Sequence, residues 1–266
     1  MKKTIALLTT VLSVALFSGA AAADTPDTIA VIDAYFDKSK LAGNFSEICV
    51  SDSGCSDVPT VADGETSLTH GTIMAQIIAK NNPGAKVILI KAGSVVGTKL
   101  YQANAREISN AFLAVPNSVS VVSISIRNNN GTLNSCRPGT KSPGSAVPNI
   151  STEISRTQSA INSLVGSGVG VIAAAGNLPE KNNTAIDYPA CLPNVTAVAK
   201  ASGDGSVRSQ GILNPELDIK VYPSVGLIGN LNTTSGITAA VAAKWNTIKS
   251  TIISNSKQFV KLNVIN

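Results

Sequence analysis

Short apolar runs alternate along this chain with longer segments in which apolar residues recur at three- and four-residue spacing. The runs are nearly continuous in Val, Ile and Ala, which is typical of strands that other layers cover on both faces. The predicted strands are Thr28 to Ile32, Lys86 to Lys91, Val119 to Ile126, Val169 to Ala174, Val195 to Ala199 and Leu217 to Val221.

Segments with helical periodicity lie between these runs. The predicted helices are Gly71 to Lys80, Tyr101 to Leu113, Ser151 to Leu164 and Ser235 to Ile248. Because strands alternate with helices, the pattern predicts an α/β fold of three layers, with a mostly parallel central sheet and helices on both faces. Residues Leu41 to Ser67 are polar and interrupt this alternation, so we interpret them as a surface excursion.

The N-terminus has the composition of a secretory signal peptide. Lys2 and Lys3 precede an apolar core from Ile5 to Phe17, and small residues from Ser18 to Ala23 form a cleavage zone. The apolar core is shorter than the roughly 20 residues that span a bilayer, which disfavours a membrane anchor. We therefore expect residues 1–23 to be removed, residues 24–266 to form one domain, and the protein to be exported to the periplasm or beyond, with no membrane association after cleavage.

Charge and aromatic content disfavour nucleic-acid binding. The formal net charge is +5, of which Lys2 and Lys3 supply two charges, and aromatic residues make up only 4% of the chain. No basic run stands out, so a mildly basic surface is the better interpretation.

Export gives the four cysteines a meaning. In an oxidising compartment, Cys49, Cys55, Cys136 and Cys191 are expected to form two disulfides. Three pairings are possible; we favour Cys49 with Cys55, a small local loop, and Cys136 with Cys191, which ties distant segments. A zinc site is disfavoured because the chain has one histidine and lacks closely spaced cysteine pairs of the usual kind.

Three residues stand where acid–base and nucleophilic chemistry is possible. His70, the only histidine, is the natural acid–base group near neutral pH, although a single histidine is more often structural. Asp33 ends the first predicted strand, at the sheet edge where active sites gather; a cap or turn is the alternative. Ser235 opens the last predicted helix, where an ordinary N-cap serine is the alternative.

A fourth segment, Val171 to Asn177, is a predicted strand that ends in small residues and a side-chain amide. The small residues leave room for a substrate side chain, and the Asn177 amide can donate a hydrogen bond to a developing oxyanion. A common Gly-Asn turn is the alternative.

At these four places the chain resembles the subtilisin-like serine proteases, the subtilases. Ala30 to Asp33 is similar to their Asp motif, His70-Gly71-Thr72 to their His-Gly-Thr motif, Ala173 to Asn177 to their oxyanion segment, and Thr234-Ser235 to their nucleophile motif. The order Asp, His, Asn, Ser agrees with that family, and the resemblance spans nearly all of the expected mature chain.

The resemblance implies a subtilisin-like fold and a serine endopeptidase that forms an acyl-enzyme intermediate through Asp33, His70 and Ser235, with Asn177 as oxyanion donor. The substrate is then a protein or peptide. The resemblance further implies two sets of substrate-binding residues. Ser125, Ile126 and Arg127 would pair with the substrate backbone, and the pocket for the side chain before the scissile bond would be lined by Ala173, Ala174 and Gly176.

No cofactor or metal is assigned by the resemblance. Calcium is common in the family, but the acidic residues of the polar excursion are more simply interpreted as a solvated loop: Asp52, Asp57, Asp63 and Glu65. Few residues separate Ala23 from Asp33, so we expect the long propeptide of many subtilases to be absent.

The sequence departs from the family pattern at four positions. Tyr35 and Thr233 stand where the family usually has Gly, Gln76 replaces a small residue in the histidine helix, and Ala239 stands in place of Pro. None of these changes removes a catalytic group, but Tyr35 and Thr233 can narrow the cleft or shift its backbone, and packing around Gln76 is expected to differ.

Two other functions are compatible with this resemblance. One is a catalytically silent binding protein on the same scaffold, against which the retention of all four groups argues. The other is the catalytic subunit of a secreted complex or toxin, with a partner subunit. A lipase-like α/β-hydrolase is disfavoured because the chain has no Gly-x-Ser-x-Gly elbow.

Overall fold

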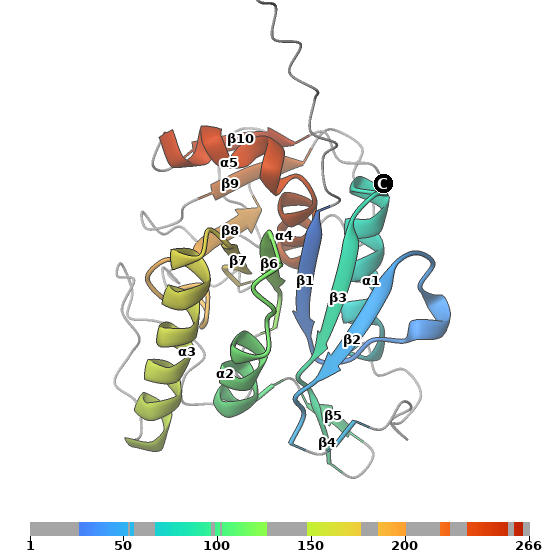
Figure 1. Ribbon diagram of the computed structural model, residues 1–266, viewed down its shortest axis with the longest axis vertical. Coiled ribbons are helices and arrows are strands. Elements are labelled where there is room, and N and C mark those ends of the chain that lie inside the picture. The colour runs from blue at the N-terminus through green and yellow to red at the C-terminus, as the bar shows by residue number, and fades with distance from the viewer. Residues whose placement is uncertain are drawn as a thin grey trace, which may run out of the picture.

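The computed structural model describes residues 27–52, 54–55, 67–96, 99–101, 103–126, 148–176, 186–200, 219–223, 233–254 and 258–262. Within these residues an eight-stranded sheet runs in the order β10-β9-β8-β7-β6-β1-β3-β2, with every neighbouring pair parallel (Figure 1). The strands are β1 (Thr28–Asp33), β2 (Phe45–Cys49), β3 (Lys86–Lys91), β6 (Val121–Ile124), β7 (Gly170–Ala174), β8 (Thr196–Lys200), β9 (Ile219–Pro223) and β10 (Gln258–Leu262).

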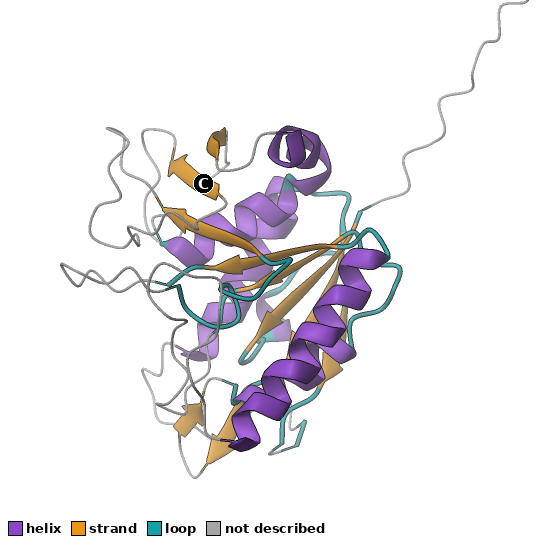
Figure 2. Ribbon diagram, turned by 90° about the vertical axis from the view of Figure 1, so that its left-hand side faces the viewer, coloured by secondary structure: helices purple, strands orange, loops and turns teal. Residues whose placement is uncertain are grey.

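Helices cover both faces of the sheet and complete three layers (Figure 2). One face carries α1 (Ser67–Asn81), α4 (Thr234–Ala243) and α5 (Trp245–Ser254), and the other carries α2 (Ala105–Leu113) and α3 (Pro148–Gly166). The predicted three-layer α/β architecture with a parallel sheet is therefore confirmed. None of the helices in the described ranges combines the length and apolar character that crossing a bilayer requires.

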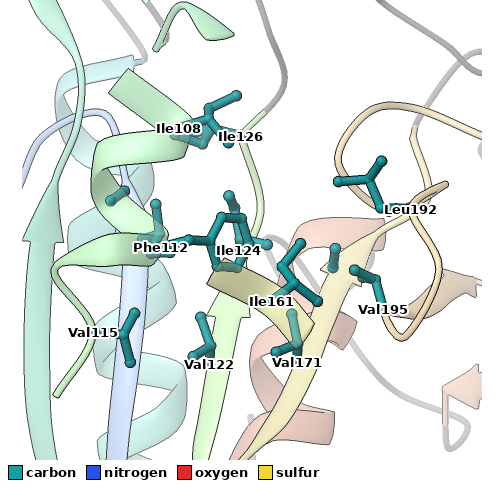
Figure 3. Packing of buried hydrophobic residues seen from close by; sticks show 14 of the residues in the cluster. Ile108, Phe112, Val115, Val122, Ile124, Ile126, Ile161, Val171, Leu192 and Val195 are labelled. Atoms are coloured by element: carbon teal, nitrogen blue, oxygen red, sulfur yellow. The ribbon is translucent and has the colours of Figure 1, made fainter. Parts of the chain in front are cut away.

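Alternate residues of β1 enter two separate cores. In β1, Ala30 and Ile32 belong to the core beneath α2 and α3, whereas Ile29 and Val31 belong to the core beneath α1 and α4. Figure 3 shows the first core, in which Phe112 of α2 lies among the strand residues. Full burial of each such side chain contributes about 1.5–3 kcal/mol relative to exposure.

The structure contains strands outside the predicted set, and all four predicted helices have other bounds. Strand β2 lies in the expected surface excursion; it is half-exposed at the sheet edge, so it lacks a continuous apolar run. A separate antiparallel hairpin, β4 (Ser94–Val96) with β5 (Lys99–Tyr101), replaces the predicted start of α2, and β10 adds an edge strand. The last predicted helix is divided into α4 and α5 at Lys244.

The first residue of α5 packs closely on the sheet. Trp245, the first residue of α5, is buried with its indole against the backbone of Gly170 at the start of β7, where an added Cβ would lie 2.3 Å from the ring. Only glycine leaves room for the indole at that contact, so this tryptophan and glycine fix how α5 sits beneath the sheet.

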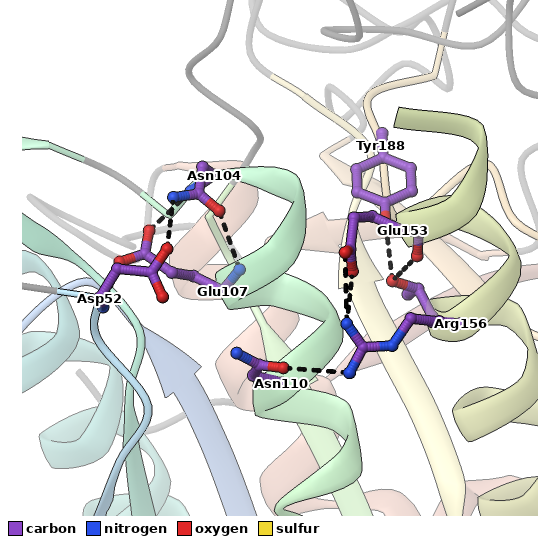
Figure 4. Close-up of polar contacts among 8 residues, drawn as sticks. Asp52, Asn104, Glu107, Asn110, Glu153, Arg156 and Tyr188 are labelled. Atoms are coloured by element: carbon purple, nitrogen blue, oxygen red, sulfur yellow. Dashed lines mark hydrogen bonds and ion pairs between the residues drawn. The ribbon is translucent and has the colours of Figure 1, made fainter. Parts of the chain in front are cut away.

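A disulfide-closed turn is fastened to α2. Cys49 and Cys55 are bonded to each other. Between them, the Asp52 N–H donates to Glu107 Oε1 at 2.9 Å, and Asn104 Nδ2 donates to Asp52 Oδ2 at 3.3 Å (Figure 4). Asn104 and Glu107 also form the capping box that opens α2. These bonds therefore join the turn, which follows the edge strand β2, to α2.

Only one cysteine of the second predicted disulfide lies within the described residues. Cys191 is disulfide-bonded and fully buried. Cys136, its predicted partner, lies outside the described residues, as do residues 1–26 with the predicted signal peptide.

Candidate active site

Asp33 ends β1 at the carboxyl edge of the sheet, with a fully buried side chain. Its Oδ1 accepts the N–H of Ala34 at 2.8 Å, and its Oδ2 contacts Nδ1 of His70 at 2.8 Å. Both carboxylate oxygens are therefore oriented by hydrogen bonds, one to the backbone and one to the imidazole. A buried carboxylate of this kind fixes the ring that it contacts.

His70 lies in the first turn of α1, because this helix begins at Ser67 rather than at the predicted Gly71. Its side chain is 34% exposed, so one edge of the ring meets Asp33 while the ring remains accessible. Since Nδ1 faces the carboxylate, Nε2 is the nitrogen left to exchange a proton with another group.

Gly71 explains how α1 approaches Asp33 so closely. A Cβ at this position would lie 2.5 Å from the carbonyl oxygen of Tyr35 and 2.8 Å from Cβ of Asp33. Any larger residue would push the first turn of α1 away from the end of β1. The glycine after His70 is thus a steric condition for the contact between imidazole and carboxylate.

The negative charge of Asp33 raises the pKa of His70 above its ordinary value of 6.5. Burial of the ring opposes this effect, and the hydrogen bond to Asp33 adds to it. The imidazolium is therefore stabilised by the carboxylate, so a proton taken up at Nε2 is held more firmly than by an isolated histidine.

Ser235 is the second residue of α4 and is 5% exposed. Thr233 caps this helix: its hydroxyl oxygen accepts the N–H of Gly236 at 3.0 Å. The cap leaves Ser235 near the positive end of the helix dipole, where developing negative charge is stabilised.

The N-terminal ends of α1 and α4 lie at the same edge of the sheet. Asn82, directly after α1, donates from Nδ2 to the carbonyl of Ala243, the last residue of α4, at 3.2 Å, so the C-terminal ends meet. Both helices then pack along each other in one core, with Met74, Ile78, Ile237 and Val241 among its members. Their first turns, with His70 and Ser235, accordingly lie at the edge where β1 ends.

No hydrogen bond within the described residues engages Ser235 Oγ or His70 Nε2. The structure therefore brings Asp33 and His70 into direct contact and Ser235 to the same edge, with the hydroxyl not bonded to the ring. Within the described residues, hydrogen bonds therefore orient the Asp33 carboxylate and the His70 ring, whereas none orients the Ser235 hydroxyl.

The predicted substrate-binding residues divide into core and edge positions. Ile126 and Ala173 are buried in the core beneath α2 and α3, and Figure 3 shows Ile126 in this core. Ala174, on the opposite face of β7, is half-buried, and Gly176 has a φ of 120°, which favours glycine. Ser125 has a buried hydroxyl without a hydrogen-bond partner.

Asn177 and Arg127 lie outside the described residues. The strand ends that lead to them are described: Ala175 N–H donates to the carbonyl of Val198 at 2.9 Å, which anchors the backbone just before Gly176. In the described part of the chain, no group of three or more His, Cys, Asp or Glu side chains is placed to hold a metal ion.

Two contacts near the site were not predicted from the sequence. Thr72 accepts the Asp37 N–H at 2.8 Å, and Gln76 donates to the Lys40 carbonyl at 2.9 Å. Gln76 is exposed on α1, and the expected difference in packing around it stays a prediction. Gln76 lies one helical turn after Thr72, and this spacing was the available signal in the sequence. The sequence did not show which segment faces both residues.

Tyr35, a second departure from the expected pattern, is buried in the core. The ammonium of Lys91 lies 5.1 Å from the centre of its ring, a cation–π contact between the residues that follow β1 and end β3. The tyrosine therefore braces the strand ends rather than standing free in the cleft.

A model of the family described as "Peptidase_S8: Subtilase family" matches residues 27–259. One similar solved structure is the Patellamide maturation protease PatA, with 17% identity, 87% of this chain and 81% of that chain covered, and a TM-score of 0.57. Another is the Prenylagaramide maturation protease PagA, with 19% identity, 86% of this chain and 77% of that chain covered, and a TM-score of 0.54. A third is the epidermin leader peptide processing serine protease EpiP from Staphylococcus aureus, with 18% identity, 86% of this chain and 68% of that chain covered, and a TM-score of 0.57. These likenesses show the fold. No curated protein matches the chain.

Proposed function

We propose that this chain, which belongs to the subtilase family and is a serine protease, is an exported endopeptidase that uses Asp33, His70 and Ser235 as its catalytic groups. The observation that carries the proposal is the 2.8 Å contact between His70 Nδ1 and Asp33 Oδ2, at the edge where the helix of Ser235 begins.

In the first step, Ser235 Oγ attacks the carbonyl carbon of a peptide bond while its proton passes to His70 Nε2. A serine hydroxyl is a weak nucleophile until a base takes its proton, and Nε2 is the ring nitrogen not held by Asp33. The carboxylate keeps the neutral ring in the tautomer with a proton on Nδ1 and stabilises the imidazolium that forms. The imidazolium then gives its proton to the leaving amine, and water repeats the sequence on the acyl-enzyme.

The oxyanion of each tetrahedral intermediate needs donors fixed before the reaction. The Ser235 N–H lies in the first turn of α4, so it points away from the helix body without an intrahelical acceptor. We assign the second donor to the Asn177 side chain. Loss of such an amide costs about 10²–10³ in kcat, a magnitude that comes from subtilisin itself.

The substrate is a protein or peptide. Ser125 to Arg127 would pair with its backbone, and Ala173, Ala174 and Gly176 would border the side chain before the cleaved bond. The solved neighbours named above include two maturation proteases and a leader peptide processing protease, which supports a peptide substrate without fixing its sequence.

Export follows from the predicted signal peptide in residues 1–23. A disulfide between Cys49 and Cys55, with a further bonded cysteine at Cys191, is consistent with an oxidising compartment. We propose a periplasmic or secreted protein, without nucleic-acid or membrane partners after cleavage and with no assigned cofactor. A partner subunit is the second possibility for a chain of this kind, and co-purification from the native host tests it.

The experiment is cleavage of a randomised peptide library by the purified mature chain, with the Ser235→Ala variant as control. We expect new N-termini from the wild-type protein and none from the variant. Equal cleavage by both proteins would assign the activity to a contaminant. No cleavage by a folded wild-type protein would favour the silent binding scaffold.

A further inference from the structure

The chain after Asp33 does not leave the site freely but doubles back along α1. Asp37 caps a short 3-10 helix, η1 (Lys38–Lys40), and this turn lies beside α1. Two side chains of α1 hold the turn, and both bonds run from a helix side chain to a backbone group.

The first bond is buried at its helix end. The Asp37 N–H donates to the hydroxyl oxygen of Thr72 at 2.8 Å, and Thr72 is only 2% exposed. The second bond lies at the surface, where Gln76 Nε2 donates to the carbonyl oxygen of Lys40 at 2.9 Å. Because Thr72 and Gln76 are four residues apart, they share one side of α1.

The turn also has hydrogen bonds and ion pairs of its own. Asp37 caps it by accepting from the N–H of Ser39 at 3.1 Å and from its hydroxyl at 2.6 Å, and Lys40 pairs with Asp37 at 3.1 Å. Lys38 pairs with Glu47 of β2 at 2.8 Å, which links the turn to the edge of the sheet. The turn that α1 contacts is therefore itself linked to the edge of the sheet.

From these contacts we propose that Thr72 and Gln76 are positioning residues: together they clamp α1 to the chain that follows Asp33 and thereby hold His70 Nδ1 against the Asp33 carboxylate. The inference rests on the proposed function for its kinetic consequence, but the clamp itself concerns only the geometry of the pair.

The physical reason is that His70 and Asp33 stand on different elements, α1 and β1, whose relative position sets their distance. Gly71 permits close approach, but a steric fit limits only how near the helix can come. The clamp adds the opposing restraint, which limits how far the first turn can move away. A catalytic contact that loosens by about 1 Å loses up to about 10²-fold in rate.

His70 offers a direct reporter because it is the only histidine in the chain. Its imidazole proton resonances titrate without overlap from other histidines. Among the described residues, the charged groups around the pair are Asp33 on β1, Lys91 at the end of β3, and Asp37 and Lys40 in the turn. Helix α4 contributes none, since Thr234 to Ala243 contains no ionisable side chain except hydroxyl groups. Replacing the neutral Gln76 leaves all of these charges in place.

The test compares Gln76→Ala with Gln158→Ala. Gln158 on α3 donates to the carbonyl of Pro193 at 3.0 Å, which is the same kind of helix-to-loop bond on the other face of the sheet. NMR titration of His70 is performed in a Ser235→Ala background, which prevents self-digestion. We expect Gln76→Ala to lower the titration midpoint by about 0.5 pH unit, because a looser Asp33 contact stabilises the imidazolium less. Gln158→Ala should leave it unchanged.

Kinetics on the otherwise wild-type chain complete the test. Gln76→Ala is expected to lower kcat by about threefold with KM unchanged, and Thr72→Val by about tenfold, while Thr72→Ser, which keeps the acceptor oxygen, restores the rate. An unchanged His70 midpoint in Gln76→Ala, or an equal fall in Gln158→Ala, would overturn the clamp. A shifted midpoint in a chain that cleaves no peptide would support the clamp and reject the proposed function.

Discussion

Two groups of polar side chains on opposite faces of the sheet differ in how fully they are hydrogen-bonded: the contacts of Glu107 and Tyr188, and the site of Asp33, His70 and Ser235. Beneath α2 and α3, the Glu107 carboxylate accepts the N–H groups of Asp52 and Asn104, and the Tyr188 hydroxyl donates to Thr157 at 2.8 Å. In the site beside α1 and α4, the Asp33 carboxylate is bonded in this way, to the Ala34 N–H and to His70 Nδ1. Among the described residues, nothing donates to or accepts from the Ser235 hydroxyl or His70 Nε2.

The difference separates stability from function. A buried polar group that is fully paired contributes to folding and would cost about 1–3 kcal/mol if its partner were lost. A group left unpaired at an accessible edge contributes little to folding, but it is ready to bond with a substrate. The proposed chemistry therefore lies at the start of α1 and α4, and the paired contacts of Glu107 and Tyr188 belong to the scaffold.

The sharpest way to break this comparison is to remove the nucleophile. Ser235→Ala should lower kcat by about 10⁶, because removal of the serine in subtilisin costs that much. The free energy of unfolding should change by less than about 1 kcal/mol, since no bond of the hydroxyl is lost. Peptidase assay and urea unfolding measure the two quantities; a large loss of stability with activity retained would reverse this assignment.

Asp33→Asn tests the oriented half of the site and should lower kcat by about 10⁴. The wild-type pKa of His70 is raised by Asp33, so the acidic limb of kcat/KM should have its midpoint above 6.5. Without the carboxylate, that midpoint should fall. The sign follows because His70 must be neutral to act as base, and the carboxylate favours the charged form.

The same pair makes a small contribution to folding. A histidine with a raised folded pKa adds stability that is present below the unfolded value of 6.5 and is lost as pH rises through the folded pKa. Asp33→Asn should therefore reduce this pH dependence of unfolding. An acidic limb that stays in place in Asp33→Asn would show that another group controls it.

Gly71→Ala tests the close approach of α1. The new methyl group would lie 2.5 Å from the Tyr35 carbonyl oxygen and 2.8 Å from Asp33 Cβ. Overpacking of this kind costs about 1–3 kcal/mol, and the displaced His70 should lose about 10²-fold in kcat. Gly84→Ala is the matched control because a Cβ there meets nothing within 4 Å. Equal losses in both variants would remove the steric account of this glycine.

Tyr188→Phe tests the scaffold contacts and should have the smallest effect. Removal of the hydroxyl leaves Thr157 Oγ1 without its donor, at a cost of about 1 kcal/mol in the free energy of unfolding. The kcat of the folded fraction should be unchanged. Thermal unfolding and active-site titration check both statements; a fall in kcat as large as that of Gly71→Ala would place this network in the site.

The sequence predicted the layers because burial on both faces gives continuous apolar strands such as Lys86 to Lys91. It did not predict β2, which has one neighbour and mixed polarity, or the break between α4 and α5 at Lys244. Helical periodicity also placed the start of α1 after His70, although polar residues from Ser67 extend the helix.

Residue types and their order were enough to single out Asp33, His70 and Ser235 as candidates. The supports around them were not predictable, because each is a contact between a side chain and a distant backbone group. Gln76 was interpreted only as a packing change, and its acceptor on Lys40 is a carbonyl, which every residue carries. Asn177 lies outside the described residues, so its role stays a prediction.

Covalent labelling by a fluorophosphonate tests the central claim most directly, because this reagent reacts with a serine only when its hydroxyl is activated. We expect labelling at Ser235 alone, at a rate that rises with pH through a midpoint above 6.5 and falls by orders of magnitude in Asp33→Asn. A folded wild-type chain that takes up no label, or a labelling rate that does not depend on Asp33, would contradict the account.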